Sequence, residues 1–137
     1  MNYRPLDPWL FRVYDQRPIL LGSWCGSCRE HFFPRRRLCP ICLRDATAVE
    51  LPGVGTLYSH TYVHGRAVAW GKVYTDGYGV GEVDLTNGPR IQSVLTGEPG
   101  VWEIGAPMHI DLEVVKESDG DRVVMYCFRP EGESAHA

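Results

Sequence analysis

Two pairs of cysteines place the strongest constraint on how this chain can fold. Cys25 and Cys28 form one pair and Cys39 and Cys42 the other, each with two intervening residues, and ten residues separate the pairs. This spacing lets both thiolates of a pair reach one metal ion, and two pairs complete a tetrahedral shell of four sulfur ligands. The pattern predicts a zinc ribbon with one structural Zn²⁺, because a closed set of soft thiolates leaves no position for water or substrate.

Composition favours a compact protein in a reducing compartment. The 137 residues are 44% hydrophobic and 23% charged, which is enough for a buried core. The longest apolar runs fall far short of the roughly 20 residues that cross a bilayer, and the N-terminus lacks the pattern of a secretion signal. We therefore expect a cytoplasmic protein without membrane contact, where paired cysteines bind metal more often than they form disulfides. The fifth cysteine, Cys127, lies among apolar residues and is interpreted as a small buried side chain.

A short amphipathic helix is predicted ahead of the ribbon. Apolar residues recur at helical spacing over 8–15, and Asp7 is a candidate N-cap. Such a helix is too short to be stable alone, so its apolar face must dock on another element. A strand over 19–24 is expected to lead into the first cysteine pair. The apolar patch at 32–34, between the pairs, is expected to pack over the zinc site.

From residue 54 onward, short stretches with strand character alternate with turns. The predicted strands cover 54–64, 78–85, 90–96, 108–114 and 122–128. Five strands in about 75 residues, the first long enough to bend around the sheet, predict a small closed barrel of the OB type. The predicted organisation is an N-terminal helical segment over 1–18, a zinc ribbon over 19–50, an OB-fold over 51–130 and a disordered tail over 131–137. The fold class is mainly β.

Several motifs together resemble the acyl-CoA-associated zinc-ribbon/OB-fold family. They are the tryptophan-containing segment before the ribbon, Cys-Gly-Ser-Cys, Phe33-Pro34-Arg35, Cys-Pro-Ile-Cys, the run 55–61, Ile104-Gly105 and Phe128-Arg129-Pro130. The resemblance covers residues 8–130 and implies a rubredoxin-like ribbon followed by the barrel. It also implies the role of a small accessory subunit bound to a thiolase, a hydroxymethylglutaryl-CoA synthase-like enzyme, a hydratase or an aldolase. The chain departs from the family pattern at Leu43, where a glycine is expected, and in a longer connection over 65–77.

Charge is distributed unevenly along the chain. Residues 25–44 carry five arginines and one glutamate, a net charge of +4, which leaves −7 for the rest of a chain whose total is −3. Arg35, Arg36 and Arg37 have two interpretations. They can offset the net charge of about −2 of a zinc ion with four thiolates, or they can pair with the phosphates of coenzyme A, since a guanidinium binds phosphate in a bidentate manner. Trp70, in the long connection, is a candidate for the wall of an acyl pocket.

We predict a non-catalytic subunit of a hetero-oligomeric acyl-CoA enzyme, most simply one of the thiolase type, which helps to bind the CoA thioester. A refinement is a bulky or aromatic acyl group, for which an additional wall is most useful. No residue is assigned a catalytic role, because His60 and His64 are about 13 Å apart on an extended strand and neither has an evident nucleophile or orienting carboxylate.

Two alternatives belong to other classes. A module that binds single-stranded nucleic acid would use barrel aromatics interleaved with basic residues, but between residues 54 and 95 the only cations are Arg66, Lys72 and Arg90. An independent small enzyme would show turnover from the purified chain alone.

Overall fold

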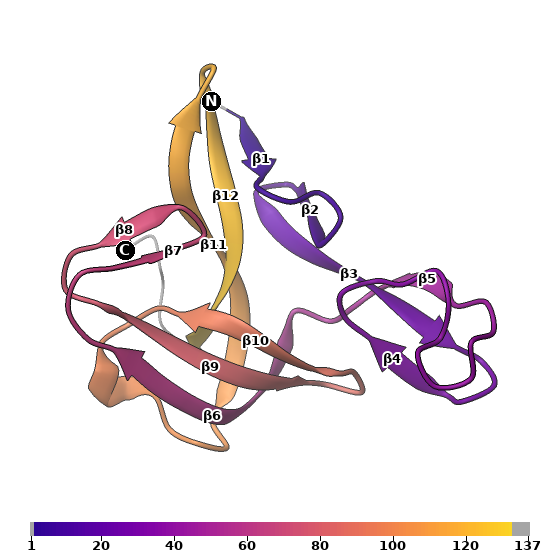
Figure 1. Cartoon of the computed structure of the whole chain (residues 1–137). Helices are drawn as coiled ribbons and strands as arrows, with labels where there is room; N and C mark the ends of the chain where they lie inside the picture. Colours follow the sequence, from indigo (N-terminus) through magenta and orange to yellow (C-terminus); the bar gives the residue numbers. More distant parts are fainter. Residues whose placement is uncertain (1, 133–137) are drawn as a thin grey trace.

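Nearly all regular structure in the chain is β-strand (Figure 1). The computed structural model describes residues 2–132. Its strands are β1 Tyr3–Pro5, β2 Phe11–Tyr14, β3 Arg17–Cys25, β4 Glu30–Phe32, β5 Thr47–Glu50, β6 Val54–Val63, β7 Ala67–Ala69, β8 Lys72–Tyr74, β9 Tyr78–Leu85, β10 Arg90–Leu95, β11 Pro107–Ser118 and β12 Asp121–Pro130. A single turn of 3₁₀ helix, η1 Pro99–Val101, connects β10 to β11. The prediction of a mainly β protein is confirmed.

Five strands close into a barrel. They are hydrogen-bonded in the order β12, β10, β9, β6 and β11, and β11 pairs in turn with β12. The short β1 pairs in parallel with the beginning of β12, at Arg122 to Val124. The predicted closed five-stranded barrel is therefore confirmed, and the strand over 78–85 has the predicted bounds. The predicted tail at 131–137 lies mostly outside the described residues.

Alternation of side chains along β9 fills the barrel. Its buried positions are Gly79, Gly81, Val83 and Leu85, while the residues between them are half-buried. Gly79 makes room for Trp102, whose indole lies where a side chain at position 79 would be, and Gly81 makes room for the side chains of Leu95 and Leu57. The indole nitrogen of Trp102 donates to the carbonyl of Thr96 at 2.9 Å, so the polar edge of the buried ring is also held in place.

The prediction of an N-terminal helix is wrong. Phe11–Tyr14 is a strand, and it pairs with Arg17–Leu20 through a two-residue turn at Asp15 and Gln16. Both turn residues have positive φ, 51° and 60°, the geometry of the tight hairpin turns that match strand twist. Asp7 does act as a cap, since its carboxylate accepts from the amide of Trp9 at 2.9 Å, but it closes one turn only.

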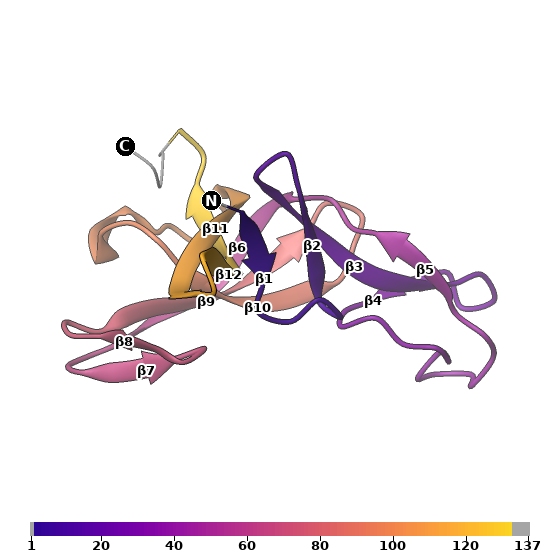
Figure 2. The ribbon, with the colours of Figure 1, turned by 90° about the horizontal axis from the view of Figure 1, so that it is seen from above.

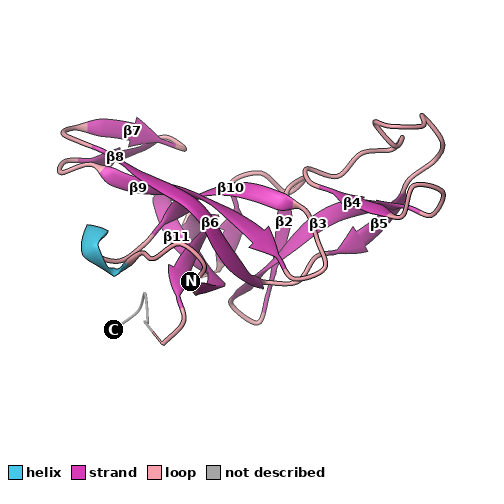
Figure 3. Cartoon of the chain, turned by 90° about the horizontal axis from the view of Figure 1, so that it is seen from below, coloured by secondary structure: helices cyan, strands magenta, loops and turns pink. Residues whose placement is uncertain are grey.

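The long strand β3 belongs to two substructures. Its first half pairs with β2 beside the barrel, and its second half pairs with β5 and β4 in the cysteine-containing ribbon. Figures 2 and 3 show the consequence, because β4 and β5 project away from the barrel while β2 and the start of β3 lie against it. One continuous backbone therefore joins the ribbon to the barrel.

The aromatic patch between the cysteine pairs packs differently from the prediction. Phe33 contacts Tyr126 of β12 edge-on, with ring centroids 5.8 Å apart, and Phe11 contacts the same ring at 5.8 Å. Phe33 therefore joins the hydrophobic core shared by β2, β3 and the barrel instead of covering the cysteines. The sequence did not reveal this because Tyr126 is more than 90 residues away along the chain.

The connection over 65–77 forms a small hairpin outside the barrel. Strands β7 and β8 are joined by Trp70 and Gly71, with φ values of 57° and 80°. Lys72 donates to Glu113 of β11 at 2.8 Å, an ion pair that ties the hairpin to the barrel wall. The hairpin thus carries the exposed Trp70 at its tip. Figure 1 shows β7 and β8 beside the barrel.

Within residues 2–132, none of the helical structure is long or apolar enough to span a lipid bilayer.

The packing of Trp102 against β9 yields a prediction about stability. Gly79→Ala should destabilise the protein by about 1–3 kcal/mol, because the new methyl group would overlap the buried indole. Urea unfolding followed by tryptophan fluorescence measures the change. Gly100→Ala is the control, since a Cβ there meets no atom within 4 Å; equal effects of the two substitutions would contradict the role given to Trp102.

Candidate functional site

The four predicted cysteine ligands lie together at the far end of the ribbon. Their sulfurs are all within 4.8 Å of one another, with 3.6 Å between Cys25 and Cys42 and 3.9 Å between Cys28 and Cys39. Four ligands at a Zn–S distance of about 2.3 Å in a tetrahedron would be separated by about 3.8 Å. A disulfide would require about 2.05 Å, and all five cysteines are free thiols. Four thiolates at this spacing can hold one zinc ion.

Two tight turns bring the sulfurs together. The amide of Arg29 donates to the carbonyl of Cys25 at 2.7 Å, and the amide of Leu43 donates to the carbonyl of Cys39 at 2.9 Å. Arg29 and Leu43 both have positive φ, 54° and 64°. Leu43 stands where the family pattern has glycine, and it adopts the left-handed conformation that glycine adopts without strain. The departure changes the residue and leaves the turn intact.

Backbone hydrogen bonds prepare the sulfurs for a negative charge. The amide of Cys28 donates to the sulfur of Cys25 at 3.4 Å, and that of Ile41 donates to the sulfur of Cys39 at 3.3 Å. Burial acts to raise the pKa of the Cys39 thiol, but hydrogen bonds from the amides of Cys42 and Ile41 and with the thiols of Cys25 and Cys42 outweigh it and lower the pKa to about 7. The hydrogen bond with Cys42 acts in the opposite direction on Cys28 and, with burial, raises its pKa to about 12. Thiolates are the form that binds metal.

Loss of one ligand should release the metal and loosen the ribbon. We expect Cys39→Ser to contain much less than one zinc ion per chain and to melt at a lower temperature, because metal binding is coupled to folding. Metal content by mass spectrometry and thermal unfolding by circular dichroism test this.

Cys127→Ala is the matched control. Cys127 is buried in β12, outside the cluster, so this variant should keep its zinc. A Cys39→Ser protein that retained one zinc ion and the wild-type melting temperature would contradict the assignment.

The three consecutive arginines, Arg35, Arg36 and Arg37, have separate roles. The guanidinium of Arg35 stacks 3.9 Å from the ring centre of Trp9, and its Nε donates to the carbonyl of Trp9 at 2.9 Å. Arg36 and Arg37 are exposed, and neither side chain has an ion pair within residues 2–132. Arg35 thus fastens the N-terminal turn to the ribbon, while Arg36 and Arg37 are accessible to a ligand.

The position of this segment is set by a buried hydroxyl. The Oγ of Ser23 donates to the carbonyl of Arg36 at 2.8 Å and accepts from the amide of Arg36 at 2.6 Å. Ser23 is 1% exposed and lies on β3. The backbone of the arginine segment is therefore fixed even though the side chains of Arg36 and Arg37 extend into solvent.

Trp70 lines a cavity of about 480 Å³ together with residues immediately before the arginines. The walls come from the segment 33–34, the tip of the β7–β8 hairpin, β9, β10 and Tyr126. Most of these side chains are apolar, and Arg90 is the one cation among them. Its guanidinium pairs with Asp84 at 2.6 Å and lies 3.3 Å from the ring centre of Tyr58. The volume is within the range of small-molecule sites.

His60 and His64 pack among aromatic rings. His60 and Tyr62 lie beside the ring of Trp102, at 6.1 and 6.2 Å, and His64 lies 5.0 Å from the ring of Tyr62. In the part of the chain that the structure describes, the cysteine quartet is the only group of three or more side chains arranged to hold a metal.

Comparison with known proteins identifies the family. A DUF35 domain-containing scaffold protein of Methanothermobacter thermautotrophicus is 31% identical over 122 residues, which cover 87% of this chain and 90% of the relative. The chain belongs to the DUF35 family. A second DUF35 domain-containing scaffold protein, from Methanocaldococcus jannaschii, is 27% identical over 122 residues, covering 87% of this chain and 85% of the relative. Residues 48–113 also match the family model of the C-terminal OB-fold domain of ChsH2.

Two solved structures share the DUF35 architecture. A chain of the Ltp2-ChsH2(DUF35) aldolase superposes with a TM-score of 0.65 at 29% identity, covering 82% of this chain and 84% of that one. A DUF35 protein of unknown function from Sulfolobus solfataricus superposes with a TM-score of 0.52 at 15% identity, covering 82% and 76%; this second match concerns the fold alone. The resemblance inferred from the sequence motifs is confirmed.

The sequence did not reveal the other residues of the Trp70 cavity. Val80, Val94 and Tyr126 come from three strands that meet only in the closed barrel. In the structure, Ser93, Val94 and Leu95 of β10 are buried in succession. A strand buried on both faces needs a covering element, and the segment that contains Phe33 is close to that outer face.

The separate role of Arg35 gives a stability prediction. Arg35→Ala should lower the free energy of unfolding by about 1–2 kcal/mol through loss of the stacking on Trp9 and of a backbone hydrogen bond. Arg37→Ala should stay within about 0.5 kcal/mol of wild type, as is usual for exposed positions. Chemical denaturation measures both; a larger effect at position 37 than at position 35 would contradict the division of roles.

Proposed function

We propose that this DUF35 protein is a non-catalytic subunit of a hetero-oligomeric enzyme that acts on CoA thioesters. The observation that carries the proposal is the likeness, over most of both chains, to the DUF35 chain of an aldolase, together with relatives described as scaffold proteins. The lack of a recognisable catalytic set among residues 2–132 agrees with chemistry performed by a larger partner.

In this proposal the cysteine quartet holds one structural zinc ion. Cys25, Cys28, Cys39 and Cys42 supply all four ligands, and a closed tetrahedral shell has no open position for catalysis. The ion stabilises the ribbon, which in turn holds the arginine segment in place through Ser23.

The CoA thioester would bind along the segment that leads from the arginines to the Trp70 cavity. Arg36 and Arg37 are the exposed cations for the phosphates, since guanidinium groups pair well with phosphate oxygens. Phe33 and Pro34, which precede the arginines, line the apolar cavity that Trp70 borders. An acyl chain lying there would contact Trp70, as the sequence predicted for this residue. The site is complete only when the catalytic partner supplies its reactive groups.

The class of the partner is the finer part of the proposal. The sequence favoured a partner of the thiolase type, with a bulky or aromatic acyl group as a refinement, and the structural relative is part of an aldolase. With either class of partner, an additional wall from Trp70 would be most useful for a bulky acyl group. Partner identification distinguishes them.

The test is reconstitution. The tagged chain is expressed in its native host, and co-purified proteins are identified by mass spectrometry. The catalytic subunit is then produced alone and assayed for thiolytic and retro-aldol cleavage of acyl-CoA esters, with and without this chain. We expect turnover to depend on both chains. Full activity of the larger chain alone, or turnover by this chain alone, would overturn the proposal.

Substitution of the exposed arginines tests the CoA contact. In the reconstituted complex, Arg36→Ala and Arg37→Ala should each weaken the binding of a CoA ester about 5- to 20-fold, since a charge-assisted hydrogen bond contributes about 1–2 kcal/mol. Isothermal titration calorimetry measures the change.

Arg29→Ala is the matched control. Arg29 is an exposed cation of the same ribbon, and its removal should change the affinity less than twofold. If all three variants weakened binding equally, the effect would come from the overall charge of the ribbon and the specific contact would be wrong.

A further inference from the structure

One edge of β11 is open along part of its length. Strand β11 pairs with β12 from end to end, but it pairs with β6 only from Pro107 to His109. The ladder with β6 ends in one more bond, in which the amide of Ile110 donates to the carbonyl of Gly53 at 2.8 Å. Beyond this point no strand within residues 2–132 pairs with that side of β11. The open stretch ends at the β-bulge between Val114 and Lys116.

The direction of the backbone groups follows from the bonds on either side. The backbone N–H and C=O groups of even-numbered residues point toward β6. The carbonyl of Ala106 accepts from the amide of Leu57 at 3.0 Å, and the amide of Ile110 donates to the carbonyl of Gly53. Alternation along a strand then directs the N–H and C=O groups of Leu112 and Val114 to the open edge. The described residues provide no backbone partner for these two residues on that side.

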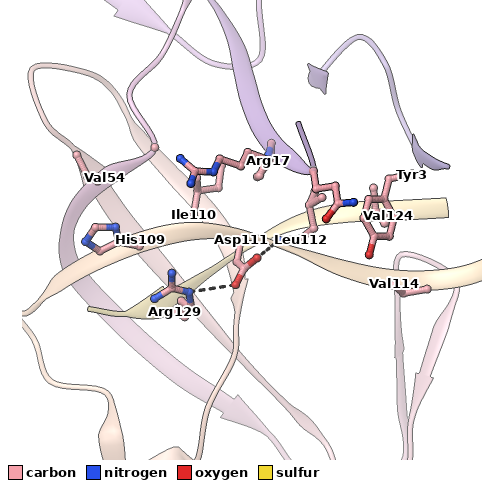
Figure 4. A pocket seen from close by; sticks show the side chains of 13 residues that line it. Tyr3, Arg17, Val54, His109, Ile110, Asp111, Leu112, Val114, Val124 and Arg129 are labelled. Atoms are coloured by element: carbon pink, nitrogen blue, oxygen red, sulfur yellow. Dashed lines mark hydrogen bonds and ion pairs between the residues drawn. The ribbon is translucent and has the colours of Figure 1, made fainter. Parts of the chain in front are cut away.

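A groove of about 790 Å³ runs along this edge (Figure 4). One wall is β11, with Ile110, Leu112 and Val114, and the opposite wall is the β2–β3 turn with Arg17. In Figure 4 the side chain of Arg17 extends over the groove beside Ile110. Arg17 is exposed and has no ion pair within residues 2–132.

A side chain occupies part of the edge. The carboxylate of Asp111 accepts from the amide of Leu112 at 2.8 Å, while its other oxygen accepts from Nε of Arg129 at 3.0 Å. Exposed edges in natural proteins are commonly guarded against accidental pairing. The Asp111 carboxylate protects one donor of the edge, the amide of Leu112. A carbonyl oxygen of an incoming strand can take over this hydrogen bond while Asp111 stays bound to Arg129.

We propose that this groove receives an extended segment of a partner polypeptide, which adds to β11 as a strand. The segment forms backbone hydrogen bonds with Leu112 and Val114, places alternate apolar side chains on Ile110 and Val114, and carries an acidic residue that pairs with Arg17. This is the recognition mode in which backbone bonds give affinity and side-chain positions give specificity. The inference is independent of the CoA contact proposed above.

Charge distinguishes this occupant from a second copy of the chain. Antiparallel pairing of two β11 edges would bring Asp111 and Glu113 of one copy opposite the acidic residues of the other, and directly opposed like charges destabilise a sheet. Arg17 has no ion pair within residues 2–132 and would pair with an anionic side chain of the occupant. In a second copy, that side chain would have to be one of the acidic residues of β11 itself. A segment of a different protein meets both requirements if it carries one acidic residue near Arg17 and uncharged residues opposite Asp111 and Glu113.

The experiment uses peptides selected for binding. A random decapeptide library on phage is selected against the full-length protein, and the strongest binder is synthesised with a fluorescent label. Fluorescence anisotropy measures its Kd, and amide hydrogen exchange by NMR locates it. We expect a selected sequence with alternating apolar residues and at least one acidic residue. The peptide should slow exchange at Val114 while leaving amides of the ribbon unchanged.

Two variants separate strand addition from other modes of binding. Val114→Pro removes the edge donor without touching the ladder to β12 and should weaken binding about tenfold or more. Arg17→Glu, at an exposed position, should weaken peptide binding by a similar factor. This variant keeps the test possible if the proline variant does not fold.

Four results would overturn the proposal. These are failure to select a binder, protection elsewhere on the surface, equal binding to the wild-type and Arg17→Glu proteins, and self-association of the free protein that itself protects Val114. Displacement of the peptide by inorganic phosphate at millimolar concentration, with no effect of Val114→Pro, would assign the groove to a small anion and would also contradict it.

Discussion

The packing of β3 against the barrel determines where the cysteine ligands and the arginine segment lie. Leu20 of β3 and Phe11 of its hairpin partner are completely buried in one core with Tyr126 of the barrel. The same strand ends at Cys25, so the backbone that is fixed in the core also supplies the first metal ligand. Because Ser23 lies between these two points and holds Arg36, the arginine segment is positioned by the barrel as well as by the cysteines.

The sequence predicted those features that depend on local patterns. The cysteine spacing located the ligand quartet, and alternation with turn signals located the barrel strands, including β9 with its bounds. The N-terminal helix was wrong because apolar residues at 9, 10, 13 and 14 fit helical spacing, while the deciding feature was the pair of left-handed residues Asp15 and Gln16. Neither residue type demands that conformation, so tertiary packing made the choice.

Features formed by distant segments could not be predicted in the same way. The core contact of Phe33 with Tyr126, the cavity beside Trp70 and the open edge of β11 each require the closed barrel. The three arginines looked equivalent in sequence, but the structure divides them. Arg35 is used internally against Trp9, which leaves two exposed cations for a ligand.

The parts of the molecule have separate tasks. The ribbon fixes the arginine segment, the β7–β8 hairpin presents Trp70, and the barrel holds the two at a constant separation. A subunit built in this way would provide half of a ligand site, with the reacting groups contributed by another chain. In the proposed complex, the acidic barrel and the basic ribbon would meet different parts of the partner.

Hydrogen exchange in the assembled complex tests this central claim most directly. Exchange is measured by mass spectrometry for this chain alone and bound to its catalytic partner, each with and without a non-hydrolysable CoA thioester analogue. The account predicts that the analogue slows exchange over residues 33–37 and 69–72 in the complex and much less in the isolated chain. Unchanged exchange in both segments of the complex, despite a saturated site, would contradict it.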